Sequence, residues 1–302
     1  MADDNVFTNL MAARNLRAAA EACVRNPQHA TDLEVSVEEV AAWRDAASAV
    51  SIPYDDELGV HPQCANFTRF GEWDFEASVG HYPLMMHSPY FELYRKQVIK
   101  QADLMLAMHW CGDVFTPEQK ARNVDYYERR TVRDSSLSAC TQAVVCAEVG
   151  HLELAHRYLH EAALMDLHDL HHNTKDGLHI ASLAGGWSAL VEGFGGLREH
   201  HTLLYLAPVL PESITRLAFR VRWWGMRLLV EVGDGYVQCS LPEQDDRSMA
   251  LVLYDEKVEV TGQAPVRRPL RQRVPLLPSP VQPVGREPLM DGEPLTDDEP
   301  VP

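Results

Sequence analysis

The sequence has little positive charge and no long apolar run, and both shortages exclude classes of function. With 27 Lys and Arg against 44 Asp and Glu, the formal net charge is -17. Such a charge disfavours nucleic acid and anionic membranes as partners, because affinity for either comes from Lys and Arg. No stretch approaches the roughly 20 apolar residues of a membrane-spanning helix. A local pocket can still be positive, so an anionic substrate fits this composition.

Paired cysteines are also missing. The six cysteines form no Cys-x-x-Cys motif, which leaves a zinc ribbon or a redox pair without support. Scattered thiols are typical of a reducing compartment, and the acidic start at Asp3 and Asp4 is unlike a secretion signal. We therefore predict a cytoplasmic protein. The His-rich run at 166–172 has no clear ligand geometry and falls at a predicted helix end, so we predict no metal site.

Helix signals dominate residues 1–207. The motifs Ser-Val-Glu-Glu at 36–39 and Thr-Pro-Glu-Gln at 116–119 have the spacing of capping boxes, which satisfy free amides of a first helical turn. Helices joined by short turns favour a bundle, toroid or solenoid of hairpins, and the lack of a fixed repeat makes a solenoid the weaker choice. The predicted helices cover residues 7–25, 36–50, 89–109, 137–149, 151–165 and 178–194.

The pattern changes near residue 208. Residues 217–223 alternate apolar and basic side chains, which is typical of a half-buried strand, and Gly-Asp-Gly at 233–235 predicts a hairpin turn. Further strands are predicted at 226–232, 236–240, 249–254 and 257–261. The sequence therefore predicts three parts: a helical domain at 1–207, a small antiparallel β domain at 208–264, and a disordered tail rich in proline and acid at 265–302.

Two hydroxyls precede an apolar helix at Asp134-Ser135-Ser136. They stand beside the free backbone amides at the positive end of a helix dipole, which is a favourable place for an anion such as phosphate. The alternative is an ordinary N-cap that needs no ligand.

His179 precedes the small-residue run at 181–186, where a ligand or another backbone can approach closely. It could donate to a phosphate oxygen, or it could be a hydrogen-bonded histidine in a tightly packed helix. Lys100 and Gln101 fall inside the predicted helix at 89–109. The lysine must reach water, a carboxylate or a ligand, and the amide can bind two sugar hydroxyls. Residues 70–74, with Trp73 and two carboxylates, suit either a sugar site or a surface loop.

Together these stretches resemble glycoside hydrolase family 65, the family of inverting disaccharide phosphorylases that act on maltose, trehalose and kojibiose. The resemblance implies the second half of an (α/α) barrel of helical hairpins, followed by a small antiparallel β-sandwich. It also implies that Lys100 and Gln101 hold the glucose unit, and that Ser135, Ser136 and His179 bind phosphate. The matching stretches, in the family's order, are 4–9 (Asp-Asn-Val-Phe-Thr-Asn), 67–74 (Phe-Thr-Arg-Phe-Gly-Glu-Trp-Asp), 96–103, 131–138 (Thr-Val-Arg-Asp-Ser-Ser-Leu-Ser), 165–179, 184–187 and 193–196.

The sequence departs from the family at the general acid. That acid is a glutamate in a Gly-Pro-Asp-Glu-Tyr-His motif just upstream of the element at 4–9, and no such motif occurs in the 302 residues. We expect the acid to lie upstream of Met1, which leaves open whether Met1 is the true start of the protein. We therefore assign no catalytic residue and expect a C-terminal part that is inactive alone. Disaccharide and inorganic phosphate are the expected substrates, with no cofactor, and the family commonly forms homodimers.

Three alternatives stay open. The chain could belong to an α-glucoside hydrolase, with Asp134 as the base that activates water, although we interpret this residue as a helix cap. It could be half of a split enzyme whose partner chain supplies the N-terminal part. It could also be a non-catalytic sugar- or phosphate-binding remnant or scaffold.

Overall fold

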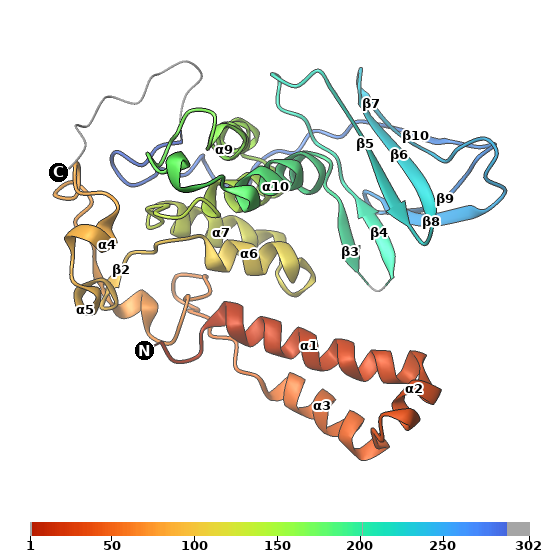
Figure 1. The fold of residues 1–302 in the computed structure, drawn as a ribbon, viewed down its shortest axis with the longest axis horizontal. Coiled ribbons are helices and arrows are strands. Elements are labelled where there is room, and N and C mark those ends of the chain that lie inside the picture. Colours follow the sequence, from red (N-terminus) through yellow and green to blue (C-terminus); the bar gives the residue numbers. More distant parts are fainter. Residues whose placement is uncertain (1, 201, 289–302) are drawn as a thin grey trace.

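The chain folds as a helical body with a β domain at one side (Figure 1). This computed structural model describes residues 2–200 and 202–288. It confirms the predicted fold class, mainly helical with a small C-terminal β domain, while the complete barrel stays an inference from the family resemblance. Met1 lies outside the described residues, and the general acid expected upstream of it stays a prediction. No helix among the described residues is long and apolar enough to cross a membrane.

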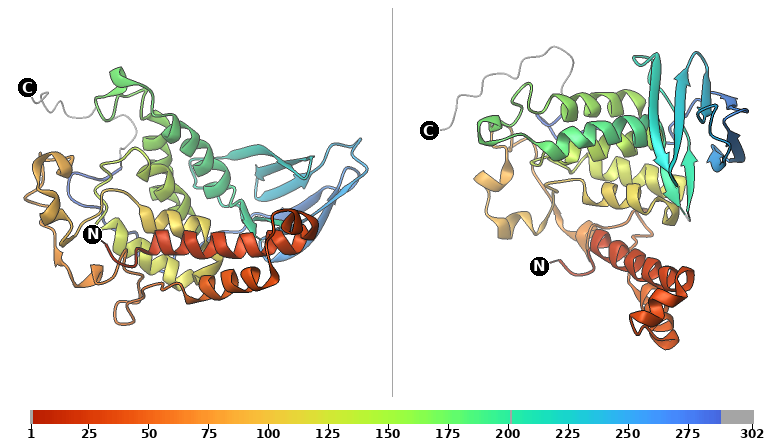
Figure 2. Two further views of the ribbon diagram at one scale, coloured as in Figure 1. Left: turned by 60° about the horizontal axis from the view of Figure 1, so that its bottom comes forward. Right: turned by 45° about the vertical axis from the view of Figure 1, so that its right-hand side comes forward.

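An N-terminal hairpin lies along one edge of the body (Figure 2). It consists of α1 (Val6–Arg25), α2 (Pro27–Asp32) and α3 (Val37–Ala49). Asn5 caps α1 by accepting from the Thr8 amide at 2.9 Å, and Ser36 caps α3 by accepting from the Glu39 amide at 3.0 Å. The predicted helices at 7–25 and 36–50 therefore form as expected.

The prediction of one long helix at 89–109 is wrong. The segment instead contains α5 (Tyr90–Leu93), β2 (Lys96–Gln97) and α6 (Asp103–Trp110). Ile99 explains the break, because its amide donates to Arg130 and its carbonyl accepts from Val132, each at 2.9 Å. These bonds to a neighbouring segment replace the bonds that a helix would make to itself. The preceding connection holds η1 (Phe67–Arg69), β1 (Gly71–Glu72) and α4 (Leu84–His87), and β1 pairs with β2 in parallel.

The remaining helices form the body. Thr116 and Gln119 close the predicted capping box at the start of α7, and Gly150 joins α8 to α9 with a φ of 97° that favours glycine. The stretch predicted as one helix at 178–194 is α10 followed by a π-helical turn. The elements are η2 (Gly112–Val114), α7 (Pro117–Glu128), α8 (Ser138–Val149), α9 (Leu152–Leu164), η3 (Thr174–Asp176), α10 (Ile180–Ser188) and the π-helix η4 (Ala189–Phe194).

Two four-stranded sheets make up the β domain, in the orders β10-β7-β6-β5 and β3-β4-β8-β9. The second sheet begins at Arg198, before the predicted boundary at 208, because the short strands β3 and β4 add to its edge. The β4–β8 pair is parallel, so the expected all-antiparallel pairing is wrong at that position. The strands are β3 (Arg198–His200), β4 (Leu203–Leu206), β5 (Arg216–Trp223), β6 (Met226–Gly233), β7 (Tyr236–Ser240), β8 (Ser248–Leu253), β9 (Glu256–Thr261) and β10 (Val266–Pro269).

The prediction of disorder from residue 265 is also wrong for the described residues. β10 pairs with β7, and residues 270–288, here called the strap, return from the β domain to the helical body (Figure 1). Arg273 donates to the Glu148 carbonyl at 2.6 Å, and the buried Gln282 donates to Glu128 at 3.0 Å. Tertiary hydrogen bonds therefore order a segment whose composition alone favours disorder. Residues 289–302 lie outside the described residues.

Candidate functional site

The two helices that carry the predicted phosphate residues run side by side in the same direction. A Cβ added at Gly185 of α10 would lie 2.4 Å from Cys140 near the start of α8, and one at Gly193 would lie 3.3 Å from Val144 further along α8. Small residues therefore let the two backbones approach closely. Ser135 and Ser136, just before α8, and His179, just before α10, lie at the same end of the helix pair.

The backbone bonds of Ile99 bring the next residue, Lys100, to the same end of the helix pair. Ile99 pairs with Thr131, and the charge of Lys100 acts to lower the pKa of Asp134. Lys100 itself is exposed and lies in a bend before α6 rather than inside a helix. Gln101 is half-buried there and donates to Asp103 Oδ1 at 2.9 Å, which leaves its amide oxygen to accept from a ligand.

The predicted cap before α8 is only weakly formed. Ser135 Oγ accepts from the Leu137 amide at 3.4 Å, the long limit of a hydrogen bond. Asp134 does not cap α8. Its Oδ2 accepts at 2.7 Å from the amide of Leu84, the first residue of α4, and its Oδ1 lies 3.3 Å from Arg286 Nη2. Interpreting Asp134 as the cap of its own helix was therefore wrong.

His179 is oriented by a carboxylate. Asp166 Oδ1 lies 2.6 Å from His179 Nδ1, and Asp166 Oδ2 accepts from the His179 amide at 2.8 Å. Asp166 thus fixes the ring and places the proton on Nδ1, which leaves Nε2 to meet a ligand. The ring of His171 lies 5.9 Å away, and burial lowers the pKa of His171, as do Arg286 and other nearby cations.

Arg133 is a buried cation that the sequence did not single out. Its guanidinium donates to the Glu161 carboxylate through Nε at 3.2 Å and through Nη2 at 3.3 Å. The Arg133 side chain is 4% exposed. Burial opposes the charge, but Glu161, Tyr158 and Glu128 together outweigh burial and raise the pKa of Arg133. Its φ of 54° is unusual for a residue with a side chain and is a form of strain that clusters at functional sites.

The strap adds a second arginine. Arg286 donates through Nε to the Val132 carbonyl, pairs with Asp134, and lies with its guanidinium carbon 4.9 Å from the ring centre of Tyr82. Burial raises the pKa of the Asp134 carboxyl, and Arg286 opposes that rise. The arginine thereby neutralises the carboxylate closest in sequence to the two serines.

Glu128 lies deeper in the body and is fully buried. It accepts from Tyr158 at 2.6 Å, from Gln142 at 2.7 Å and from Gln282 of the strap at 3.0 Å. Burial raises the pKa of Glu128, while the three donors oppose the rise. This network ties α7, α8, α9 and the strap together beneath the candidate site.

A groove of about 330 Å³ adjoins the site. Leu84 links the two, because it lines the groove and its amide binds Asp134. Trp73 also lines the groove and is anchored by donation to Ser78 Oγ at 2.8 Å. The carboxylates Glu72 and Asp74 line it as well, so three of the residues at 70–74 face a groove, and their role in sugar binding stays a prediction.

Sequence reasoning proposed the two serines and His179 as site residues but did not single out several of their neighbours. Arg133 lies inside the matching stretch at 131–138. Its position in that stretch could have marked it as a candidate site residue. Arg286 had no such signal, because it comes from a segment predicted to be disordered. Asp166 was noted within the His-rich run and within the matching stretch at 165–179, but it was given no role, although its position at a helix end allowed it to bind a following helix.

Comparison with known proteins shows the family to which the chain is related. Residues 1–188 match the glycosyl hydrolase family 65 central catalytic domain, and residues 197–260 match the family's C-terminal domain. An uncharacterised glycosyl hydrolase of Mycobacterium leprae is 60% identical over 286 residues, which are 95% of this chain and 36% of that protein. The α,α-trehalose phosphorylase of Geobacillus stearothermophilus is 37% identical over 273 residues, 87% of this chain and 35% of that protein.

A solved structure provisionally named as a kojibiose phosphorylase from the human microbiome superposes with a TM-score of 0.76 at 25% identity, over 89% of this chain and 40% of that one. The chain thus spans about a third of the length of the curated relatives it matches. The fold and the comparisons place the chain among the glycosyl hydrolases and phosphorylases of one family. The chain belongs to glycoside hydrolase family 65.

Proposed function

We propose that this chain is the C-terminal part of an inverting α-glucoside phosphorylase, which transfers glucose from an α-linked disaccharide to phosphate and forms β-glucose 1-phosphate. The observation that carries the proposal is the convergence of Ser135, Ser136 and His179 at one end of α8 and α10, with Lys100 beside them. Relatives named trehalose, kojibiose and maltose phosphorylase support this reaction class.

The residues divide the work as follows. Ser135, Ser136 and Nε2 of His179 bind phosphate, while Lys100 and Gln101 hold the glucose unit. Phosphate attacks the anomeric carbon opposite the leaving oxygen, through a transition state that resembles an oxocarbenium ion. A carboxylic acid protonates the leaving oxygen, and we place that acid upstream of Met1, since the family's acid motif is absent from residues 1–302.

Phosphorolysis is favoured over hydrolysis by the contacts of Asp134. An inverting hydrolase needs a carboxylate that activates water, whereas phosphate is already a nucleophile. Both oxygens of Asp134 are engaged, one by the Leu84 amide and one by Arg286. The aspartate is therefore poorly placed to act as a base, and its paired charge repels phosphate less.

The test is co-expression of this chain with a family segment that carries the acid motif, followed by assay on trehalose, kojibiose and maltose with phosphate. We expect β-glucose 1-phosphate as product. The variant Ser135→Ala/Ser136→Ala should raise the KM for phosphate by about tenfold or more, because hydrogen bonds to a charged group contribute roughly 1.5–3 kcal/mol. The KM for disaccharide should change less.

Ser48→Ala is the matched control, because Ser48 is an exposed residue of α3 whose hydroxyl binds only the Arg44 carbonyl. Its KM for phosphate should equal that of the wild type. Release of free glucose independent of phosphate would favour the hydrolase alternative. Turnover with unchanged KM in the double variant would reject the phosphate assignment.

A further inference from the structure

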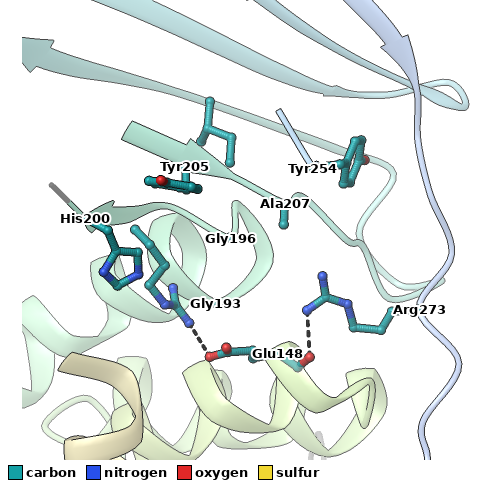
Figure 3. A pocket seen from close by; sticks show the side chains of 10 residues that line it. Glu148, Gly193, Gly196, His200, Tyr205, Ala207, Tyr254 and Arg273 are labelled. Atoms are coloured by element: carbon teal, nitrogen blue, oxygen red, sulfur yellow. Dashed lines mark hydrogen bonds and ion pairs between the residues drawn. The ribbon is translucent and has the colours of Figure 1, made fainter. Parts of the chain in front are cut away.

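We call the proposed phosphate site at Ser135, Ser136 and His179 the serine site. We propose that a second anion site, separate from it, lies where the helical body meets the β domain, and that this second site binds a phosphate group. The two domains and the strap enclose a cavity of about 190 Å³ there (Figure 3). Its walls include Glu148 of α8, Arg198 of β3, Tyr205 of β4 and Arg273 of the strap. We call it the seam cavity. The proposal does not depend on the proposed phosphorylase activity.

Cations outnumber carboxylates around the seam cavity. Glu148 receives Lys120 Nζ at 2.5 Å on one oxygen and Arg198 Nη2 at 2.7 Å on the other. Burial opposes its charge, but Arg198 and Lys120 outweigh burial and lower the pKa of Glu148 to about 2. One ionised carboxylate therefore faces two cations before Arg273 is considered.

Arg273 has no carboxylate partner among residues 2–200 and 202–288: its recorded bond is donation from Nη1 to the Glu148 backbone carbonyl at 2.6 Å. Burial lowers its pKa and Arg198 adds to that effect, while Glu148 opposes it without outweighing burial. A half-buried cation beside another cation is costly when the nearby opposite charge is shared, and the Glu148 carboxylate is already paired with Lys120 and Arg198. A bound dianion would remove that cost. In Figure 3 the guanidinium of Arg273 extends between Glu148 and Ala207.

The nearby acids do not line the cavity. Asp255 pairs with Arg271 at 2.6 Å, Glu192 lies 3.5 Å from His109, and Asp113 lies 3.9 Å from His200. His200, which lines the cavity, has its pKa lowered chiefly by burial and is therefore neutral at pH 7. The charged side chains that line the cavity are therefore two arginines, Arg198 and Arg273, and one carboxylate, Glu148, which leaves the lining with an excess of positive charge.

The opposite wall is less polar. Tyr205 and Tyr254 present rings to the cavity, and Ala207 points its methyl group inward between them and Arg273 (Figure 3). A phosphate on Arg198 and Arg273 can therefore carry a small body against the rings. Because the walls come from the helical body, β domain and strap, such a ligand would bind all three and stabilise their junction.

The test is calorimetric titration of inorganic phosphate into this chain at constant ionic strength. To isolate the seam cavity, the titration uses Ser135→Ala/Ser136→Ala as background. We expect one remaining phosphate site, which Arg273→Gln weakens by about tenfold or more, the effect of removing a charge-assisted hydrogen bond. Arg268→Gln is the matched control, since this partly exposed arginine of β10 pairs with Glu256 and does not line the cavity.

A second variant keeps the test decisive if Arg273→Gln folds poorly. Ala207→Asp places a carboxylate inside the cavity, so it should abolish the remaining phosphate binding and raise the thermal unfolding midpoint. Glucose 6-phosphate is titrated in parallel. If glucose 6-phosphate binds more tightly than inorganic phosphate, the ligand is a sugar phosphate. If glucose 6-phosphate binds more weakly, the ligand is free phosphate.

The outcomes separate this proposal from the proposed function. If Ser135→Ala/Ser136→Ala abolishes all phosphate binding, the proposal of a seam site is overturned. It is also overturned if binding persists in that background and neither Arg273→Gln nor Ala207→Asp changes it. Binding in the wild type that Arg273→Gln alone abolishes would support the seam site and contradict the serine site.

Discussion

Carboxylates around the candidate phosphate site are each held by a donor, which keeps the local charge compatible with an anion. Arg133 grips Glu161, Arg286 pairs with Asp134, and Asp166 is bound to His179. The two arginines and the histidine come from different segments, so the balance of charge is a tertiary property. This explains how a chain with a net charge of -17 can offer a site for phosphate.

The burial of His109 leads to a prediction about how the stability of the fold depends on pH. Burial, assisted by Arg198, lowers the pKa of His109 from 6.5 to about 3, although the carboxylate of Glu148 acts to raise it. Between about pH 6.5 and pH 3 the unfolded chain binds a proton that the folded chain does not, so stability falls as pH falls, by up to ~1.4 kcal/mol per pH unit.

His109→Gln should remove that part of the slope. The check is the free energy of unfolding in urea at pH 7 and pH 5 for both proteins, with exposed His29→Gln as the control. An equal loss of stability in His109→Gln and wild type would contradict the assignment.

At the scale of elements, the contact of α8 with α10 depends on one glycine. A Cβ at Gly185 would lie 2.4 Å from the Cys140 side chain, whereas one at Gly186 would meet nothing closer than 3.8 Å. We expect Gly185→Ala to destabilise the fold by about 1–3 kcal/mol through overpacking and to weaken phosphate binding at the serine site by shifting His179.

Gly186→Ala is the matched neighbour. It should be neutral or stabilising by up to about 1 kcal/mol, because alanine favours the helix. Urea unfolding of both variants tests this pair of expectations. If the two variants lose equal stability, close packing at Gly185 is not what holds the helices together.

Local signals predicted the elements that depend on local contacts. The cap at Ser36, the box at Thr116 and the hinge at Gly150 all use residues within a few positions of each other, and each formed its element. The failures depend on distant partners. Ile99 leaves a helical pattern to pair with Thr131, and no short-range pattern in the sequence marks that partner.

The same reason limits prediction of the site. Ser135 and His179 could be proposed from their positions before helices, but their proximity depends on Gly185 meeting Cys140 across the helix pair. Arg286 joins the site from 152 residues beyond Asp134. Composition favoured disorder for its segment, and only the partners buried in the helical body make it ordered.

The strap should therefore stabilise the helical body. A chain that ends at residue 270 keeps β10 but loses Gln282 and Arg286, which leaves buried Glu128 and Asp134 without two of their donors. Each such loss costs about 1–3 kcal/mol, so we expect a clear fall in the urea midpoint. A chain that ends at residue 288 is the control and should match the full chain. Equal midpoints for all three would show that the strap contributes nothing to stability.

At the scale of the whole molecule, the outer face of α10 is apolar. Ile180, Leu183 and Trp187 recur at helical spacing and are 65%, 40% and 53% exposed. Contiguous apolar surface of this kind marks an interface, and the chain spans only 36% of its Mycobacterium leprae relative. We therefore predict that this face is buried in an interface.

The chain on its own should therefore self-associate through α10. Static light scattering should show a mass that rises with concentration, and Leu183→Glu/Trp187→Glu should reduce that rise, because the charges oppose burial of the face. Trp224→Glu is the control: Trp224 is 71% exposed but lies in the turn between β5 and β6, so its loss should leave association unchanged. A wild-type chain that stays monomeric as concentration rises would show that α10 needs no cover. In the co-expressed complex the same double variant should instead reduce assembly, since a covering segment and a second copy would compete for one apolar surface.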